Sequence, residues 1–320
     1  MLGEFDIIAR YFTRPAHSAG LGIGDDAALV VAPTGLTLAI TTDMLLEGRH
    51  FVAGADPRKL GHKALAVNLS DLAAMGADPR WFTLSIALPE VDETWLSAFS
   101  EGMFAIADAH KCEIVGGDTT RGPLVISITA IGTLPTGYAL RRDGAVEGDD
   151  VWVSGSTGDA ALALAHRQGR VTLSHAAAAS CLARLDQPEP RVALGRKLRN
   201  VANAAIDVSD GLAADLGHIL ERSKVGAEIR LDAVPRSPAV AALDDAKLAN
   251  DCLLAGGDDY ELVFTASPEK RDAVEKAGAA AGVPVTRIGR IVAGSALTVL
   301  DASGRPVALG RGGYDHFAQG

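Results

Sequence analysis

Six short segments of the sequence place an acidic side chain beside glycine or hydroxyl-bearing residues. One of them, GIGDDAALV, sets Asp25 and Asp26 side by side after a glycine-punctuated turn. Adjacent like charges are unfavourable unless a positive group lies close to them. The six segments are GDDAA (24–28), TTDMLLEGRHF (41–51), NLSDLAAMGA (68–77), GGDTT (116–120), IDVSDGL (206–212) and GGDDYEL (256–262).

Each segment alone has an ordinary structural explanation. Asp beside Gly is typical of turns, and Ser209 or Asp210 could cap the helix that follows them. Together, however, the six segments offer the hard oxygen ligands that Mg²⁺ prefers. Their glycines let a backbone approach a phosphate and offer its N–H groups. The combined pattern indicates a phosphate site that contains several Mg²⁺ ions.

Several familiar motifs are absent or incomplete. GIGDDA fits the dinucleotide fingerprint loosely, but the β-like run ALVVA follows it where a helix should begin. The sequence contains no GxxxxGK[ST], GxSxG or HExxH pattern, and its acidic segments lack the ligand spacing of an EF-hand. A histidine beside an apolar residue is more often structural, so His50 taken alone indicates no function.

The composition is that of an ordinary acidic globular protein. The chain has 320 residues, 48% of them hydrophobic, and a formal net charge of −10. This charge argues against a nucleic-acid protein, and no apolar run approaches the ~20 residues of a membrane span. The N-terminus has no basic region ahead of an apolar core, so we expect no secretory signal. Three widely separated cysteines favour a reducing cytoplasm over a zinc or disulfide framework.

Hydrophobic periodicity predicts helices and strands in both halves of the chain, which is typical of an α/β or mixed α+β fold. Helices are expected at 3–12, 56–77, 92–110, 159–167, 174–185 and after 206–211. Strands are expected at 36–43, 81–89, 112–120 (running into a glycine turn), 123–134 and 151–158, and in a strand-rich remainder at 226–232, 260–266, 285–292 and 296–301.

One helical stripe ends on a carboxylate. Leu60, Ala64 and Val67 follow i, i+4, i+7 spacing, and continuing the stripe reaches Asp71. A carboxylate at the end of a buried stripe is costly unless it is paired or binds a metal. Further along, the turn residues of PTGYALRRDGAVEGDD (135–150) interrupt the pattern, so we place the domain boundary there.

These segments, taken in order, closely resemble the thiamine-monophosphate kinase family. The resemblance runs from Gly3 to Phe317. It rests on GEF, GIGDDAAL, TTDMLLEGRHF, KALAVNLSDLAAMGADP, GGDTTRGP, IDVSDGLAADLGHI, GGDDYEL and the ending GYDHF. The wider superfamily looks like the aminoimidazole ribonucleotide synthetase group of ATP-using enzymes, and the TTD…GRHF and GGDDYEL segments narrow it to the kinases.

The resemblance implies a two-domain fold of the aminoimidazole ribonucleotide synthetase type. Residues 1–137 would form an N-terminal domain that binds ATP and Mg²⁺ and pairs its sheet with that of a second copy in a homodimer. Residues 138–320 would form a C-terminal α/β domain that closes over the active site. The implied reaction converts ATP and thiamine monophosphate to ADP and thiamine diphosphate by direct Mg²⁺-assisted transfer, with no phosphoenzyme. This is the last step of thiamine diphosphate biosynthesis.

The resemblance also assigns residues to roles. The implied metal ligands are Asp26, Thr41, Thr42, Asp43, Asp71, Asp118, Asp207 and Asp210. The implied ATP-binding residues are Gly117 in its turn, Asp118, Arg142 and Ser209. The implied substrate-binding residues are His50, Asp258 and Tyr314.

At two of these positions members of the family also carry other residues. The family often has Glu where this chain has Asp258, and sometimes Trp where it has Tyr314.

No residue is assigned as general base, because a phosphate monoester, with a second pKa of about 6, is largely deprotonated near pH 7. Asp25 is expected to support the turn.

Three alternatives remain open at this stage. One is a sister synthetase of the same superfamily that makes a cyclised amidine or a selenophosphate, although the latter should carry a reactive Cys near its N-terminus and the first cysteine here is Cys112. Another is a non-catalytic module that binds ATP and Mg²⁺ without turnover. The last is a soluble α/β dimer with acidic turns, which Mg²⁺ would not stabilise.

Overall fold

The structure, a computed structural model, describes residues 2–307. The chain folds into two compact units. The N-terminal unit comprises Met1–Leu72 and Ala77–Gly137, and the C-terminal unit comprises Ala73–Gly76 and Tyr138–Gly320. The short segment Ala73–Gly76 at the end of one helix therefore groups with the second unit.

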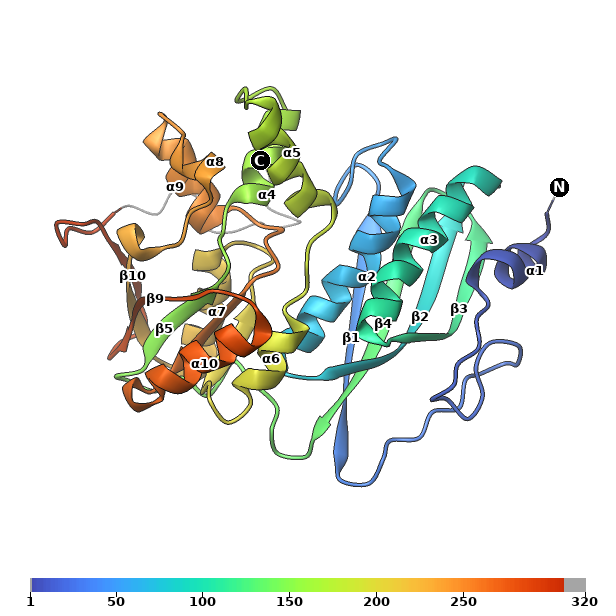
Figure 1. Cartoon of the computed structure of the whole chain (residues 1–320), viewed down its shortest axis with the longest axis horizontal. Helices are drawn as coiled ribbons and strands as arrows, with labels where there is room; N and C mark the ends of the chain where they lie inside the picture. Colours follow the sequence, from blue (N-terminus) through green and yellow to red (C-terminus); the bar gives the residue numbers. More distant parts are fainter. Residues whose placement is uncertain (1, 308–320) are drawn as a thin grey trace. The chain divides into compact units, whose positions relative to one another are not determined.

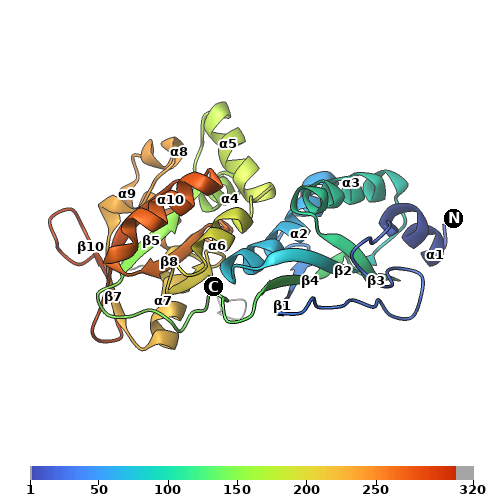
Figure 2. The same ribbon diagram turned by 60° about the horizontal axis from the view of Figure 1, so that its bottom comes forward.

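The N-terminal unit is a four-stranded sheet with two long helices on one face (Figures 1 and 2). The strand order is β1-β4-β2-β3, in which β2 and β3 are parallel and the other pairs are antiparallel. The elements are α1 (Glu4–Ile7), the π-helical turn η1 (Ile8–Phe12), β1 (Leu36–Leu46), α2 (Pro57–Ala74), β2 (Asp78–Leu88), α3 (Glu93–His110), β3 (Glu113–Arg121) and β4 (Val125–Pro135).

Helices α2 and α3 pack closely because two glycines face each other's backbone. A Cβ atom at Gly61 of α2 would overlap the carbonyl oxygen of Phe99, and one at Gly102 of α3 would overlap that of Arg58. Helix α2 also reaches the sheet, where Leu72 lies against Gly132 of β4. Because these contacts fix α2 over the sheet, they fix which β1 side chains its carboxylate can meet.

The C-terminal unit is built on a six-stranded sheet of order β10-β7-β9-β5-β8-β6, parallel at β10–β7 and antiparallel elsewhere. Helix α10 packs against α6, and α4 packs against α5 (Figure 1). The elements are β5 (Asp150–Ser154), α4 (Asp159–Arg167), α5 (His175–Asp186), α6 (Val192–Leu198), β6 (Ala204–Asp207), α7 (Leu212–Ser223), β7 (Gly226–Arg230), η2 (Leu231–Ala233), α8 (Pro238–Ala241), α9 (Ala246–Ala255), β8 (Leu262–Ala266), η3 (Pro268–Lys270), α10 (Arg271–Ala281), β9 (Val285–Val292) and β10 (Leu297–Leu300).

The predicted helical faces are confirmed. Leu60, Ala64 and Val67 of α2 are buried, as the stripe predicted. In α7, the face that begins at Leu212 and continues through Leu216 is also buried. No helix among residues 2–307 is long and apolar enough to cross a membrane.

Three local predictions are wrong. The GGDTT segment runs inside β3 rather than forming a glycine turn, and ALVVA makes one isolated bridge, Leu21 to Leu29, in place of a strand. The remainder after residue 230 contains helices α9 and α10 as well as strands. In short apolar runs and alanine-rich segments, periodicity alone does not distinguish a helix, a strand and a turn.

Candidate active site

Two carboxylates of the N-terminal unit share a half-buried position between β1 and α2. Thr41 and Asp43 alternate with exposed neighbours along β1, so both point to the helix-covered face, where Thr41 Oγ1 donates a hydrogen bond to Asp71 Oδ2. Burial, and to a smaller extent the negative charge of Asp71, raises the pKa of Asp43 to about 7. Both influences oppose ionisation of Asp43, and a bound cation would reverse them.

Asn68 holds the backbone beside this pair. Its fully buried Oδ1 accepts a hydrogen bond from the Asp43 N–H at 3.1 Å, and its Nδ2 donates to the Ala64 carbonyl at 3.2 Å. Asn68 therefore holds the Asp43 backbone in place. The signal in the sequence was its place one helical turn before Asp71, on the side of α2 that meets the sheet.

Two other predicted ligands, Thr42 and Asp118, lie on the opposite face of the sheet. Thr42 is one residue out of phase with Asp43, and its Oγ1 lies 2.8 Å from Thr129 Oγ1 on the exposed face. Asp118 lies opposite Ser85 of β2, Ser85 lies opposite Ser127 of β4, and Ser127 lies opposite Met44 of β1. Side chains opposite one another share a face of the sheet, and Met44 is two residues after Thr42, so Asp118 and Thr42 lie on the same face. The sheet therefore separates the side chains of Thr42 and Asp118 from those of Asp43 and Asp71.

Gly117 is a strand position in close contact with β2. A Cβ atom there would overlap the carbonyl oxygen of Leu84, at a φ of +153°. This contact, and not a turn, explains the glycine beside Asp118.

Asp26 and His50 lie in loops that flank β1. Asp26 is exposed, and its N–H donates to Asp25 Oδ1 at 2.8 Å, which gives Asp25 a role within the turn. The Nδ1 atom of His50 accepts from the Leu46 N–H at 3.0 Å. Nε2 therefore carries the proton of the neutral ring.

In the C-terminal unit, backbone pairing brings four predicted site residues into two adjacent loops. Asp207 is buried at the end of β6, and Ser209 and Asp210 follow it half-buried. The half-buried Asp258 donates its backbone N–H to the Ser209 carbonyl at 2.8 Å. Asp258 adopts a φ of +67°, a left-handed conformation that is unusual outside glycine.

Asp215, in the first turn of α7, organises the Ser209–Gly211 backbone. Its Oδ2 accepts from the N–H groups of Ser209, Asp210 and Gly211 at 3.0, 3.0 and 3.1 Å. Burial raises the pKa of Asp215 to about 7 although these N–H groups act to lower it. The alternative in which Ser209 or Asp210 caps α7 is not observed: the N-cap is Gly211, and Asp215 of the helix accepts from the loop N–H groups.

The remaining predicted residues are peripheral or outside the described range. Arg142 is exposed in the loop before β5, where its carbonyl accepts from Ser223 Oγ at 2.8 Å. Tyr314 lies outside the described residues.

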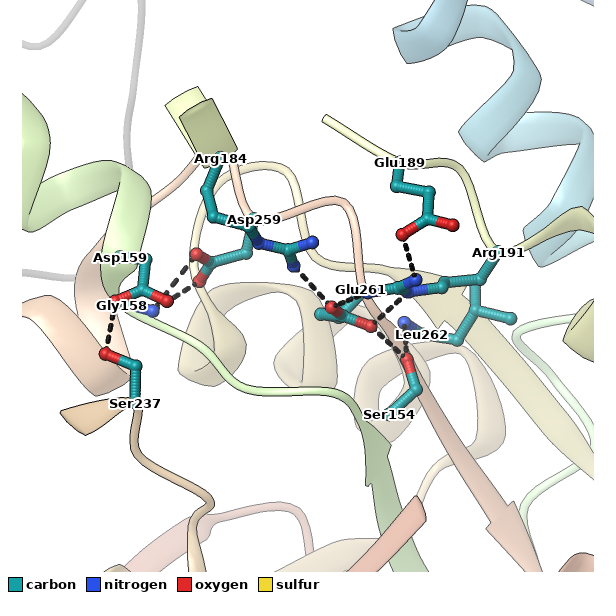
Figure 3. A network of polar contacts seen from close by, with 10 residues as sticks. All are labelled: Ser154, Gly158, Asp159, Arg184, Glu189, Arg191, Ser237, Asp259, Glu261 and Leu262. Carbon is teal, nitrogen blue, oxygen red and sulfur yellow. Dashed lines mark hydrogen bonds and ion pairs between the residues drawn. The ribbon is translucent and has the colours of Figure 1, made fainter. Parts of the chain in front are cut away.

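Next to Asp258, a buried ionic network occupies the interior of the C-terminal unit (Figure 3). The Glu261 side chain is fully buried, and it accepts from Arg191 through Nε at 2.7 Å and Nη2 at 2.5 Å. Arg184 Nη2 at 2.5 Å and Ser154 Oγ at 2.6 Å complete its partners. Burial acts to raise the pKa of Glu261, but these donors outweigh it and lower the pKa.

The buried Asp259 has different surroundings. Its two oxygens accept the Gly158 N–H at 3.0 and 2.8 Å, and burial raises its pKa well above the ordinary value.

Within residues 2–307, no group of three or more His, Cys, Asp or Glu side chains is gathered as a metal site. The donors nevertheless suit Mg²⁺ chemically. They are oxygen atoms of Asp and Thr, and the pair Asp43 and Asp71 carries negative charge in a half-buried place.

Comparison with known proteins places this arrangement in a class. Residues 24–134 match the N-terminal domain of AIR synthase related proteins, and residues 146–302 match their C-terminal domain. The fold and the two matches define a two-domain AIR synthase related protein, so the predicted fold class is confirmed.

Individual relatives narrow the class. The chain is 48% identical to the thiamine-monophosphate kinase of Salmonella typhimurium over 320 residues, which cover 99% of this chain and 98% of the relative. The crystal structure of thiamine-monophosphate kinase from Stenotrophomonas maltophilia shares 50% identity and a TM-score of 0.84, covering 92% of this chain and 94% of that one. A structure of AaThiL complexed with AMPPCP and TMP shares 32% identity and a TM-score of 0.79, covering 90% and 89%. The chain belongs to the thiamine-monophosphate kinase family, which confirms the resemblance of its motifs.

Proposed function

We propose that the protein transfers the γ-phosphoryl group of ATP to thiamine monophosphate, giving ADP and thiamine diphosphate. The observation that carries the proposal is near-full-length identity of 48% to a thiamine-monophosphate kinase. The AaThiL complex, which contains AMPPCP and TMP, is similar over 90% of this chain. The reaction joins two anions, so its main requirements are positioning and neutralisation of charge.

Mg²⁺ would be held first by Asp43 and Asp71, with Thr41 beside them. When bound there, it supplies the positive charge that lets two phosphates approach each other. The two carboxylates would bind the ion, and Asn68 keeps Asp43 in place by accepting a hydrogen bond from its N–H. We further propose Asp26, Thr42, Asp118, Asp207 and Asp210 as ligands of additional ions.

For ATP we propose Arg142, Ser209, Gly117 and Asp118 as binding residues. The exposed Arg142 guanidinium offers a planar fork that suits phosphate. Ser209 would act through its hydroxyl, because its N–H already donates to Asp215.

For thiamine monophosphate we propose His50, Asp258 and Tyr314. The thiazolium ring is cationic, and a carboxylate and an aromatic face both attract such a ring. His50 can donate from Nε2 to a phosphate oxygen, because Nδ1 is already used as an acceptor.

We propose that the protein is a homodimer in which the exposed β1 part of the N-terminal sheet, on the face away from α2, meets the same surface of a second copy. Ile40, Met44 and Leu46 of β1 are 65%, 54% and 36% exposed there. A contiguous exposed apolar face favours burial against a partner, and a self-complementary patch gives a two-fold dimer. Thr42 and Asp118 belong to this face. Met44→Asp is expected to give monomers in light scattering, and an unchanged mass would reject this interface.

We also propose a cytoplasmic location. The three cysteines, Cys112, Cys181 and Cys252, are buried and unpaired, which supports a reducing compartment.

The reaction is tested by ADP release from ATP and Mg²⁺ with thiamine monophosphate, thiamine or no acceptor. Turnover with the monophosphate alone, formation of thiamine diphosphate and loss with a chelator are expected. ATP binding without turnover would instead indicate a nucleotide-binding module or a sister synthetase.

A further inference from the structure

The side chain of Glu261 is fully buried, and Glu261 lies three residues after Asp258. Its carboxylate makes contacts to three side chains from β5, from α5 and from the segment before α6. Room for this carboxylate requires Gly155, where a Cβ atom would overlap Glu261 Oε1. The surrounding chain is therefore shaped around a buried charge.

Stability alone is a weak explanation for such a charge. Arg191 and Glu261 are 9% and 0% exposed, and removing two charges from water costs free energy that their attraction only partly returns. Well-packed apolar side chains of similar volume are often as stable or more stable in such places. The ionic network therefore needs an explanation other than stability, and the adjacent loop that contains Asp258 and Tyr260 offers one.

That loop has a strained backbone held in a defined register. Asp258 and Tyr260 have φ values of +67° and +51°, and such residues persist where the surrounding structure over-determines them. Three backbone hydrogen bonds, each of 2.8 Å, tie the segment to the β6–α7 loop: Asp258 N–H to Ser209, Tyr260 N–H to Val208, and Val208 N–H to Glu261. The Tyr260 hydroxyl donates to Asp258 Oδ1 at 3.0 Å.

Glu261 is the point where this strained segment joins the interior. Its backbone carbonyl accepts from Val208, and its side chain is held from two directions by Arg184 and Arg191 (Figure 3). A guanidinium that binds both carboxylate oxygens fixes direction as well as distance. Moving Glu261 would release the Asp258–Tyr260 segment from the loop of Asp207 and Ser209.

We propose that Glu261, clamped by Arg184 and Arg191, is a positioning residue that holds Asp258 in register with the Asp207–Asp210 loop for substrate binding. The substrate part of this inference rests on the proposed kinase function. Asp258 is the residue proposed to touch thiamine monophosphate, so loss of register acts first on the affinity for that substrate.

The sharpest test separates positioning from stability. The triple variant Glu261→Leu with Arg184→Met and Arg191→Met removes the carboxylate together with both guanidinium groups that bind it, so the protein is expected to unfold at the wild-type temperature or above. Its KM for thiamine monophosphate is expected to rise at least tenfold, with less than threefold change in KM for ATP. A stable triple variant with wild-type KM values would overturn the proposal.

Single variants complete the test. Glu261→Gln keeps the shape and loses the charge, and it is expected to raise the same KM at least tenfold. Glu261→Asp keeps the charge and is expected to recover part of the affinity. Asp150→Asn is the matched control, because Asp150 is a buried carboxylate clamped by Arg271 and Arg287 away from the loop. It should lower thermal stability with unchanged KM, and an equal KM effect from this control would reject a specific role for Glu261.

A second readout needs no substrate, so failure of the proposed kinase function would not hide the result. In Glu261→Gln, hydrogen exchange at the amides of Val208, Asp258 and Tyr260 is expected to accelerate at least tenfold, with the β7–β9 amides unchanged. If the wild-type protein fails to phosphorylate thiamine monophosphate while these amides do accelerate, the function is wrong and the positioning holds. Unchanged exchange at the three amides would overturn the positioning.

Discussion

Glu261 of the C-terminal unit and Asp43 of the N-terminal unit are buried carboxylates in opposite surroundings. Two arginines hold Glu261, and together with Ser154 they lower its pKa. In the N-terminal unit, burial and the charge of Asp71 both oppose ionisation of Asp43. The charge of Glu261 is thus offset from within the protein, whereas that of Asp43, beside a second carboxylate, still needs an offset that a cation from solution can supply.

The largest effect is expected from replacing Asp43. Asp43→Asn keeps the shape and removes the charge, so kcat/KM is expected to fall about 10³-fold, as expected when a group that stabilises transferred charge is lost. The fold should persist, because the substitution also relieves repulsion with Asp71. ADP release measures the activity, and the exposed Glu90→Gln serves as control. Retention of more than a tenth of the activity would refute the cation role.

Replacing Glu261 is expected to destabilise the fold, whereas replacing Asp43 is expected to leave the fold intact. Glu261→Leu leaves Arg191 buried without its carboxylate, so the free energy of unfolding is expected to fall by about 3–5 kcal/mol. Urea denaturation at pH 7 measures it. Glu189→Gln removes the exposed partner of the same Arg191 and should cost at most about 1 kcal/mol. Similar losses in the two variants would mean that burial does not govern what each carboxylate partner of Arg191 contributes to stability.

Mg²⁺ should stabilise the protein through the N-terminal pair. At 100 times its Kd, a ligand that binds only the native state adds about 2.7 kcal/mol. Thermal unfolding with Mg²⁺ or chelator should show the increase in the wild type and a reduced one in Asp43→Asn. A full increase in the variant would move the principal site away from Asp43.

The pH dependence of the metal-free protein sharpens the same contrast. The pKa of Asp43 rises from 3.8 when unfolded to about 7 when folded, so between these values the native state holds a proton that the unfolded state releases. Stability is therefore expected to fall by about 1.4 kcal/mol per pH unit as the pH rises from 4 towards 7, from this group alone. The slope difference between wild type and Asp43→Asn isolates it, and identical slopes would contradict the assignment.

The smallest effect belongs to an exposed ion pair of the C-terminal unit. Arg290 lies 2.7 Å from Glu228 with a 67% exposed side chain, so solvent screens the pair. Glu228→Gln is expected to change the free energy of unfolding by less than about 0.5 kcal/mol, as urea denaturation would show. A loss near that of Glu261→Leu would mean that exposure does not govern these pairs.

Much of the fold could be predicted because its helices and strands carry clear periodicity. The stripe of α2 correctly led to Asp71, and the face of α7 is buried as expected. The GGDTT segment was wrongly assigned to a turn, since Gly117 is needed for the approach of Leu84 from another strand. A contact between distant segments leaves no local trace in the sequence.

The sequence predicted the residue types of the candidate site, but it predicted their arrangement in space only in part. Thr41, Thr42 and Asp43 are consecutive in a motif, but strand alternation sends Thr42 to the other face. The supporting residues Asn68 and Asp215 act on backbone N–H groups, and only the folded chain brings those groups to them. Sequence motifs therefore predict candidate site residues, and the sheet decides which of them meet.

The strand order of the N-terminal unit has a consequence for synthesis of the chain. Strand β1 is an edge strand whose neighbour in the described sheet is β4, with Leu36 opposite Pro135 and Leu46 opposite Val125. At about 5–20 residues per second, a ribosome needs roughly 4–20 s to make the intervening residues. During that time Ile40 and Met44 belong to a strand without its neighbour, a state prone to aggregation. Nascent chains stalled before residue 125 should therefore be bound by chaperones, and those extended past residue 135 should be released.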